Sequence, residues 1–180
     1  MDIWGQGILF TYQKMSKLQV TFYSGVGTVT GANFLLESLR TRILVDCGLI
    51  QGTPDSYIEN KKPFQYDPKS IDFLFVTHAH MDHIGRLCKL VKDGFSGVIY
   101  STEETKSLAN VMIADALKVM NLKEKENENL VKEEPLYSLN DFNKAMALWR
   151  TIPYYKKTKV NNEFEVLLQD AGHILGSSMY

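Results

Sequence analysis

The chain has 180 residues, of which 44% are hydrophobic, 11% are aromatic and 23% are charged, and its formal net charge is −1. This composition fits one globular domain, and the near-zero charge excludes a global electrostatic attraction to nucleic acid or membrane, so any attraction to RNA has to be local. No apolar run approaches the roughly 20 residues of a membrane-spanning helix, and the N-terminus lacks the basic segment of a signal peptide, which predicts a cytoplasmic protein without membrane contact.

The first part of the chain predicts strands. Met15 is a suitable natural start, so residues 1–14 are interpreted as an N-terminal extension and residues 15–180 as the domain itself. Alternating or apolar β-forming residues then predict strands at residues 18–23, 32–37 and 42–46. Residues 51–70 are polar and rich in proline, which predicts a long surface loop.

The middle of the chain alternates strands with helices. Residues 73–76 and 98–100 are apolar β-formers and predict buried strands, and apolar residues at helical spacing predict a helix after each. Ser101 and Glu104 match a capping box for the second of these helices. Its buried stripe is predicted to consist of Leu108, Val111, Met112, Ala116 and Val119.

The last part of the chain predicts a mixed-charge segment, a helix and a strand. Residues 121–134 have little apolar content and are interpreted as a solvated helix end or linker. Ser138 and Asp141 match a second capping box for a helix that runs to about residue 150. Residues 164–168 predict the final strand. The overall pattern favours an α/β fold in which helices cover a sheet.

Metal-binding side chains concentrate in one motif, Thr77-His78-Ala79-His80-Met81-Asp82-His83-Ile84-Gly85, directly after a predicted strand. The sequence has four histidines, and the one outside this motif, His173, follows the last predicted strand. Side chains two residues apart in an extended loop project to the same side, so His78 and His80 can bind one ion, with His173 as a third ligand. Asp82 and His83 start the next helix and are placed for a second ion.

Two ions ~4 Å apart activate water and stabilise a leaving oxygen, which suits hydrolysis of a phosphodiester, or of an activated ester or amide. The alternative is a coincidental cluster of ordinary core or surface histidines, which this spacing disfavours. Asp46 at a predicted strand end also has two interpretations. It either caps the strand, or it orients a metal ligand without touching the ion, and the second interpretation is favoured.

The histidine motif closely resembles the signature of the metallo-β-lactamase superfamily. Three further segments, at residues 25–33, 46–52 and 171–178, resemble its β-CASP nuclease branch, specifically relatives of the pre-mRNA 3′-end cleavage endonuclease. The likeness runs from about Leu18 to Tyr180. It implies an αββα metallo-β-lactamase sandwich, of which this chain would hold the N-terminal half. It also implies a zinc-dependent ribonuclease that hydrolyses phosphodiesters of single-stranded RNA.

The resemblance further implies roles for individual residues. One Zn²⁺ would be held by His78, His80 and His173. The other would be held by Asp82 and His83, which are also the expected catalytic residues, while Asp46 matches the first motif of the family. A substrate phosphate would be held by Gly176, Ser177 and Ser178. Alternatively these last residues are simply turn residues, and the sequence leaves that choice open.

The sequence departs from the family pattern after Tyr180. Family members continue with an aspartate that bridges the two metals, the β-CASP domain and further histidines, and no histidine follows His173 here. The resemblance therefore implies an incomplete domain, or a partner that supplies the remainder, either a second copy in a homodimer or a complementing chain. It also implies that this chain alone binds metal weakly and has little or no activity.

Other functions remain open at this point. The same scaffold supports hydrolysis of a small-molecule ester or thioester, and a non-catalytic metal-binding fragment is a third hypothesis. The motifs do not separate endonuclease from 5′-exonuclease action, or RNA from DNA. An aromatic and basic patch (Tyr154, Tyr155, Lys156, Lys157 and Lys159) is either a contact for single-stranded RNA or a solvated loop, and the loop is favoured.

Overall fold

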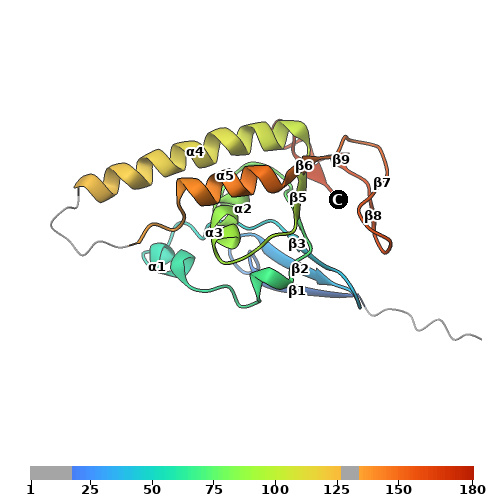
Figure 1. Cartoon of the computed structure of the whole chain (residues 1–180), viewed down its shortest axis with the longest axis horizontal. Helices are drawn as coiled ribbons and strands as arrows, with labels where there is room; N and C mark the ends of the chain where they lie inside the picture. The colour runs from blue at the N-terminus through green and yellow to red at the C-terminus, as the bar shows by residue number, and fades with distance from the viewer. Residues whose placement is uncertain (1–17, 127–133) are drawn as a thin grey trace, which may run out of the picture.

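A sheet of six strands forms the centre of the fold (Figure 1). The computed structural model describes residues 18–126 and 134–180. The strands cross the sheet in chain order: β1 (Gln19–Ser24), β2 (Asn33–Glu37), β3 (Arg42–Val45), β4 (Phe73–Phe75), β5 (Val98–Ser101) and β6 (Trp149–Thr151). Strands β1 to β3 pair antiparallel, whereas β3 to β6 pair parallel. The parallel strands therefore all end at one edge of the sheet.

One row of apolar side chains crosses the sheet and sets its register. Leu35, Leu44, Leu74, Ile99 and Trp149 lie opposite one another on successive strands, and none is more than 3% exposed. A slip by one residue would turn this row to the other face of the sheet. Burial of the row therefore specifies how the strands pair.

Helices cover the face of the sheet that carries this row. They are α3 (Leu87–Lys92), α4 (Glu103–Glu126) and α5 (Leu139–Leu148), and Figure 1 shows α4 and α5 running side by side above the strands. The predicted capping box starts α5, because Ser138 Oγ accepts from the Asp141 N–H and the Asp141 carboxylate accepts from the Ser138 N–H. That prediction is confirmed.

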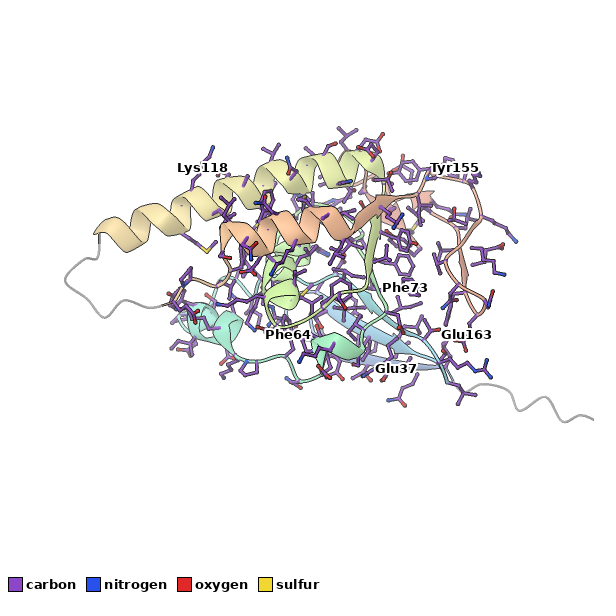
Figure 2. All side chains as sticks on the ribbon, viewed as in Figure 1. Glu37, Phe64, Phe73, Lys118, Tyr155 and Glu163 are labelled. Carbon is purple, nitrogen blue, oxygen red and sulfur yellow. The ribbon has the colours of Figure 1, made fainter. Side chains whose placement is uncertain are left out.

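The opposite face is covered by the segment that follows β6. Ile43 and Phe75 of the sheet pack there against Ile152 and Leu168. The segment contains a small hairpin, β7 (Thr158–Lys159) and β8 (Glu165–Val166). At the turn of this hairpin, Glu163 (Figure 2) accepts hydrogen bonds from the hydroxyls of Ser38 and Thr41 at 2.8 and 2.6 Å, which ties the hairpin to the β2–β3 turn. The last pair of strands is β9 (Gln169–Asp170) and β10 (Ser178–Met179).

The structure corrects the prediction of a long loop at residues 51–70. This segment contains a short helix, α1 (Ser56–Lys61), and a 3₁₀ turn, η1 (Pro68–Ser70). Pro68 starts the turn rather than breaking structure, because proline lacks the N–H that the first turn of a helix leaves unpaired. Asp67 caps the turn by accepting from the Lys69 N–H at 3.0 Å. Prolines mark the start of a helical turn as well as a loop, and composition alone does not separate the two.

The predicted cap of α4 was also wrong, and so was most of its predicted buried stripe, of which only Leu108 packs against the core. Thr102 caps α4, because its hydroxyl oxygen accepts from the Thr105 N–H at 3.2 Å. Ser101, the predicted cap, is the last residue of β5. The buried stripe consists of Thr105, Ala109, Ile113 and Leu117, while Val111, Met112 and Val119 are 40 to 63% exposed. The observed stripe lies one position along the helix from the predicted one, at 109, 113 and 117 rather than at 108, 112 and 116, because the sheet and α5 cover that face.

Several predicted segments lie partly or wholly outside the described residues. The N-terminal extension at 1–14 does so completely. Of the mixed-charge segment at 121–134, residues 121–126 continue α4 and residues 127–133 are not described. The final strand predicted at 164–168 is shorter, at Glu165–Val166. Among the helices within 18–126 and 134–180, none combines the length and hydrophobicity that crossing a bilayer requires.

The observed stripe of α4 predicts how two substitutions differ. Ile113→Ala should lower the free energy of unfolding by about 2–5 kcal/mol, because Ile113 is fully buried and its removal leaves a cavity. Val111→Ala in the same helix should change it by no more than about 0.5 kcal/mol, because Val111 is exposed. Urea denaturation measures both values. Equal costs would contradict this packing of α4.

Candidate metal centre

The candidate site lies where the parallel strands end. Asp46 follows β3, Thr77 and His78 follow β4, and Thr102 follows β5. Because these strands run in the same direction, the residues after them meet at one edge of the sheet. The short helix α2 (Met81–Ile84) begins at that edge, directly after His80. The predicted site residues from three separate segments are therefore neighbours in space.

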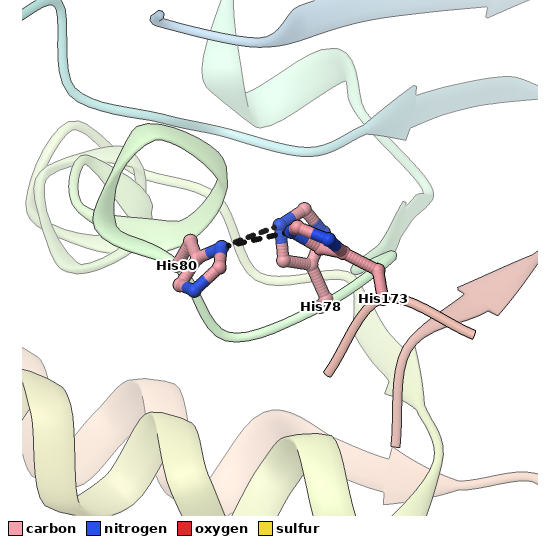
Figure 3. A group of neighbouring side chains, drawn as sticks. All are labelled: His78, His80 and His173. Atoms are coloured by element: carbon pink, nitrogen blue, oxygen red, sulfur yellow. Dashed lines mark hydrogen bonds between the residues drawn. The ribbon is translucent and has the colours of Figure 1, made fainter. Parts of the chain in front are cut away.

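Three imidazole nitrogens converge at this edge (Figure 3). His80 Nδ1 lies 3.1 Å from His78 Nε2 and 3.2 Å from His173 Nε2, and the ligand atoms of the three residues all lie within 4.8 Å of one another. A tetrahedral zinc ion with Zn–N bonds of about 2.0–2.1 Å places its nitrogens roughly 3.3 Å apart. The spacing of these nitrogens therefore fits a shared cation.

The local backbone explains how His78 and His80 come to face the same point. His80 has an extended backbone (φ −69°, ψ 147°) and precedes the first turn of α2. In extended chain, alternate side chains project to the same side, so Ala79 between them points the other way and is 2% exposed. His173 arrives from the loop between β9 and β10, as predicted. The cluster is buried at His78 and open to solvent at His173.

Hydrogen bonds assign which nitrogen of His78 is free. The Thr77 hydroxyl donates to Asp46 Oδ2 at 2.7 Å, so its oxygen accepts from His78 Nδ1 at 3.0 Å. Nε2 of His78 then keeps its lone pair toward the cluster. Burial, followed by the neighbouring imidazoles, lowers the pKa of His78 from 6.5 to about 4. His78 is therefore neutral near pH 7, which is the form that binds a metal.

Asp82 and His83, the predicted ligands of a second ion, lie next to the three histidines. The ring centroids of His83 and His78 are 3.9 Å apart, and His83 Nε2 lies 3.6 Å from Asp82 Oδ2. Burial alone would lower the pKa of His83, but the hydrogen bond to Asp46 and the charges of Asp46 and Asp82 raise it overall. The structure thus brings all five predicted ligands together, and the second ion stays a prediction.

Asp46 is buried and holds both motifs in place. Its carboxylate accepts from the Thr77 N–H, the Thr77 hydroxyl and His83 Nδ1, each at 2.7 Å. Because a carboxylate only accepts, His83 carries its proton on Nδ1 and presents Nε2 toward Asp82. Asp46 adopts φ 58°, which is uncommon for a residue other than glycine. These contacts support the orienting role predicted for Asp46.

Backbone hydrogen bonds fix α2, which carries Asp82 and His83. The carbonyl oxygens of Met81, Asp82 and His83 accept from the N–H groups of Leu49, Ala32 and Cys47 at 2.7 to 2.9 Å. The Met81 carbonyl also accepts from the Gly85 N–H at 2.8 Å, whereas a helix of one turn leaves the Asp82 and His83 carbonyls without a partner of its own. We call the three bonds from Leu49, Ala32 and Cys47 the α2 clamp. Gly48 permits them, because a β-carbon there would overlap the Asp82 carbonyl group.

The loop that carries His173 is anchored by residues for which the sequence left two roles open, contact with a substrate phosphate or a structural turn. Ser177 is 1% exposed, and its Oγ accepts from the His173 and Ile174 N–H groups at 3.1 and 3.2 Å. Ser178 is also buried, and its N–H donates to the Thr77 carbonyl at 2.9 Å. These contacts favour the interpretation of Gly176, Ser177 and Ser178 as turn residues. Their contact with a substrate phosphate stays a prediction.

Three residues that support this loop were missed. The Gly176 carbonyl accepts from the hydroxyls of Thr102 and Thr105 at 2.7 and 2.8 Å, and Tyr154 donates to the Ser177 carbonyl at 2.7 Å. Thr102 and Thr105 at the start of a predicted helix were available as a capping signal. Nothing in the sequence indicates that they also bind a loop more than seventy residues later.

The Asp46 contacts predict the effect of removing one charge. Asp46→Asn should weaken binding of Zn²⁺ about 10- to 100-fold, because an amide cannot hold both Thr77 and His83 in their present orientation. Asp115→Asn on the outer side of α4 makes the same charge change and should leave the affinity unaltered. Competition with a chromophoric chelator measures both constants. Equal affinities in the two variants would remove the role given to Asp46.

The α2 clamp predicts that Gly48 tolerates no side chain. Gly48→Ala should both destabilise the protein and weaken Zn²⁺ binding, because the new β-carbon displaces the Asp82 carbonyl and with it α2. Gly52→Ala is the control, since its β-carbon meets nothing within 4 Å and only its φ of +81° is unfavourable. We expect Gly52→Ala to cost about 1–2 kcal/mol of stability with unchanged metal affinity. Denaturant titration and metal titration separate the two effects.

The sequence of this chain is similar to those of known proteins. The metallo-beta-lactamase superfamily domain matches residues 35–180. Ribonuclease TTHA0252 of Thermus thermophilus is 33% identical over 161 residues, which are 89% of this chain and 34% of that protein. Transcription termination factor FttA of Cenarchaeum symbiosum is 32% identical over 166 residues, 91% of this chain and 24% of that protein.

A plant relative shows the same partial coverage. Cleavage and polyadenylation specificity factor subunit 3-I of Arabidopsis thaliana is 31% identical over 160 residues, 87% of this chain and 21% of that protein. The chain thus spans about a third or less of the length of these curated relatives. Their names confirm the resemblance to the RNA-processing branch, and the domain match confirms the predicted fold class. The match over residues 35–180 shows that this chain belongs to the metallo-beta-lactamase superfamily.

Proposed function

We propose that this chain carries the metal-binding residues of a metal-dependent ribonuclease that hydrolyses phosphodiesters in single-stranded RNA. The observation that carries the proposal is the convergence of nitrogens from His78, His80 and His173 at 3.1 and 3.2 Å. Two of these residues follow β4, and the third lies 93 positions further along the chain from His80. The segments that carry these histidines are distant in the sequence, and the fold brings them together at one edge of the sheet.

Zinc is the metal that we propose. Imidazole nitrogens and a carboxylate are donors that zinc binds well, and the buried thiol of Cys47 is withheld because burial raises its pKa to about 12. We assign one ion to the three histidines and the other to Asp82 and His83. A zinc ion held there supplies Lewis acidity, which lowers the pKa of a water molecule and polarises a phosphate oxygen.

The side chains of this protein supply orientation and a proton acceptor. Asp46 fixes the protonated nitrogen of His83, and Thr77 fixes that of His78, so both present a lone pair toward the site. Asp82 is partly exposed, and we assign its carboxylate the role of accepting a proton from the attacking water.

The proposal of RNA as substrate rests on the names of the relatives. One is named a ribonuclease, others are named transcription termination factors, and one is named as a subunit of a cleavage and polyadenylation factor. His173 is exposed, so a polymer can reach the cluster from that side. With a net charge of −1, attraction of RNA has to come from the metal centre and from local groups.

The first test is metal binding. Co²⁺ is a spectroscopic substitute for Zn²⁺, and we expect its visible absorption to report a tetrahedral site that His80→Ala abolishes. Asp115→Asn should bind as the unmodified chain does. Equal Co²⁺ binding by His80→Ala and the unmodified chain would contradict the assignment of the three histidines.

The second test is turnover on a substrate panel. Labelled single-stranded RNA, single-stranded DNA of the same sequence and a set of acyl thioesters and lactones are incubated with the zinc-loaded chain. We expect slow cleavage of RNA that stops on chelation and in His80→Ala. Hydrolysis of the esters without cleavage of RNA would replace the ribonuclease proposal. Cleavage that persists in His80→Ala would show that it arises elsewhere.

A further inference from the structure

A strained, exposed tyrosine lies beside the loop that carries His173. Tyr155 adopts φ 59°, and in the described part of the chain Asp46 is the only other residue besides glycine with positive φ. This conformation is rare for a bulky side chain and costs free energy. It is maintained because the Tyr155 N–H donates to the Leu168 carbonyl at 2.8 Å. The ring itself remains 71% exposed, as its position at the end of the molecule in Figure 2 also indicates.

Tyr154 connects this tyrosine to the metal centre. Its ring centroid lies 5.8 Å from that of Tyr155, and its hydroxyl donates to the Ser177 carbonyl in the His173 loop. Both tyrosines follow β6, whose end lies at the same edge of the sheet as the ends of β4 and β5. One side chain therefore separates the exposed ring of Tyr155 from the loop that holds a proposed metal ligand.

Positive charge gathers on the outer side of Tyr155. Lys156, Lys157 and Lys159 follow it and are all exposed. Lys157 pairs with Glu165 at 3.3 Å, whereas within residues 18–126 and 134–180 neither Lys156 nor Lys159 has an ion-pair partner. Negative charge lies near Tyr154 instead, where Asp170 and Glu104, after burial, help to raise its pKa. A polyanion that passes Tyr155 is therefore favoured on the lysine side.

We propose that residues 154–159 form a binding site for single-stranded RNA next to the metal centre, in which a base stacks on Tyr155 and phosphates contact Lys156 and Lys159. This inference rests on the proposed function, and it adds where the strand lies. Stacking on an exposed aromatic ring combined with basic side chains is the usual way in which proteins bind single strands without reading sequence. Tyr154 positions Tyr155 and leaves its own hydroxyl on the His173 loop.

The test measures RNA binding without metal. A fluorescein-labelled oligoadenylate is titrated with the chain in the presence of EDTA, so that binding is measured independently of cleavage. Tyr155→Ala should raise the Kd about 5- to 150-fold, which is the loss expected for one stacked base. Tyr155→Phe, which keeps the ring, should stay within about twofold of the unmodified chain. Tyr57→Ala removes another exposed tyrosine, from α1, and should have no effect.

The lysines are tested through salt dependence. The logarithm of the association constant falls as the logarithm of the salt concentration rises. In the double variant Lys156→Ala with Lys159→Ala this dependence should become shallower, by about 0.7 in slope for each phosphate that the chain no longer neutralises. Lys118→Ala, an exposed lysine on α4 (Figure 2), should leave the slope unchanged. This readout remains informative if Tyr155→Ala is less stable than the unmodified chain, and thermal melting of every variant checks the fold.

Three results would overturn the binding site. The first is an unchanged Kd in Tyr155→Ala together with an unchanged salt slope in the lysine variant. The second is that the unmodified chain does not bind the oligonucleotide. The third is that polyglutamate displaces the oligonucleotide as effectively as unlabelled RNA does. The last result would assign the surface to an acidic protein partner. None of the three bears on metal binding or on cleavage in the substrate panel, so the ribonuclease proposal would stand or fall separately.

Discussion

The α2 clamp is the interaction on which the rest of the site depends. Helix α2 has a single turn, and a helix of this length is unstable by itself because too few hydrogen bonds offset the loss of backbone freedom. The N–H groups of Ala32 and Cys47 supply partners for the Asp82 and His83 carbonyls, and the Leu49 N–H is a second donor to the Met81 carbonyl. The glycine-containing segments at 25–32 and 46–52 therefore hold α2, and α2 holds Asp82 and His83.

Asp46 joins this clamp to the histidines. Its backbone follows β3 in an unfavourable left-handed conformation, and its carboxylate binds the first residues after β4 and one imidazole of α2. The strain is tolerated because the sheet fixes Asp46 from one side and three hydrogen bonds fix it from the other. A rigid framework of this kind holds the imidazole nitrogens at metal-binding distance, which reduces the reorganisation that binding requires.

His173 belongs to a separate structural unit. It is exposed. Its loop is held by the Gly176 carbonyl, which accepts from Thr102 just before α4, and by the Ser177 carbonyl, which accepts from Tyr154 after β6. His78 is buried just after β4 and contacts the Thr77 hydroxyl. The third proposed ligand is thus held by loop contacts and the first by packing, so we expect local opening to free His173 before the other two. The same loop contacts connect the proposed RNA site at Tyr155 to the metal centre.

The sequence by itself determined the local chemistry and the central elements. Histidines two residues apart after an apolar strand, the Ser138 capping box and the apolar runs of β2 to β5 are local patterns whose physical cause lies within a few residues. Only the tertiary structure decided which side of α4 is buried, that Ser177 and Ser178 hold the His173 loop, and that Thr77, Thr102 and Tyr154 support the site. These features depend on contacts between segments that are distant in the chain. Hydrophobicity and residue spacing do not predict such contacts, because the contacts form only when the segments pack on the sheet.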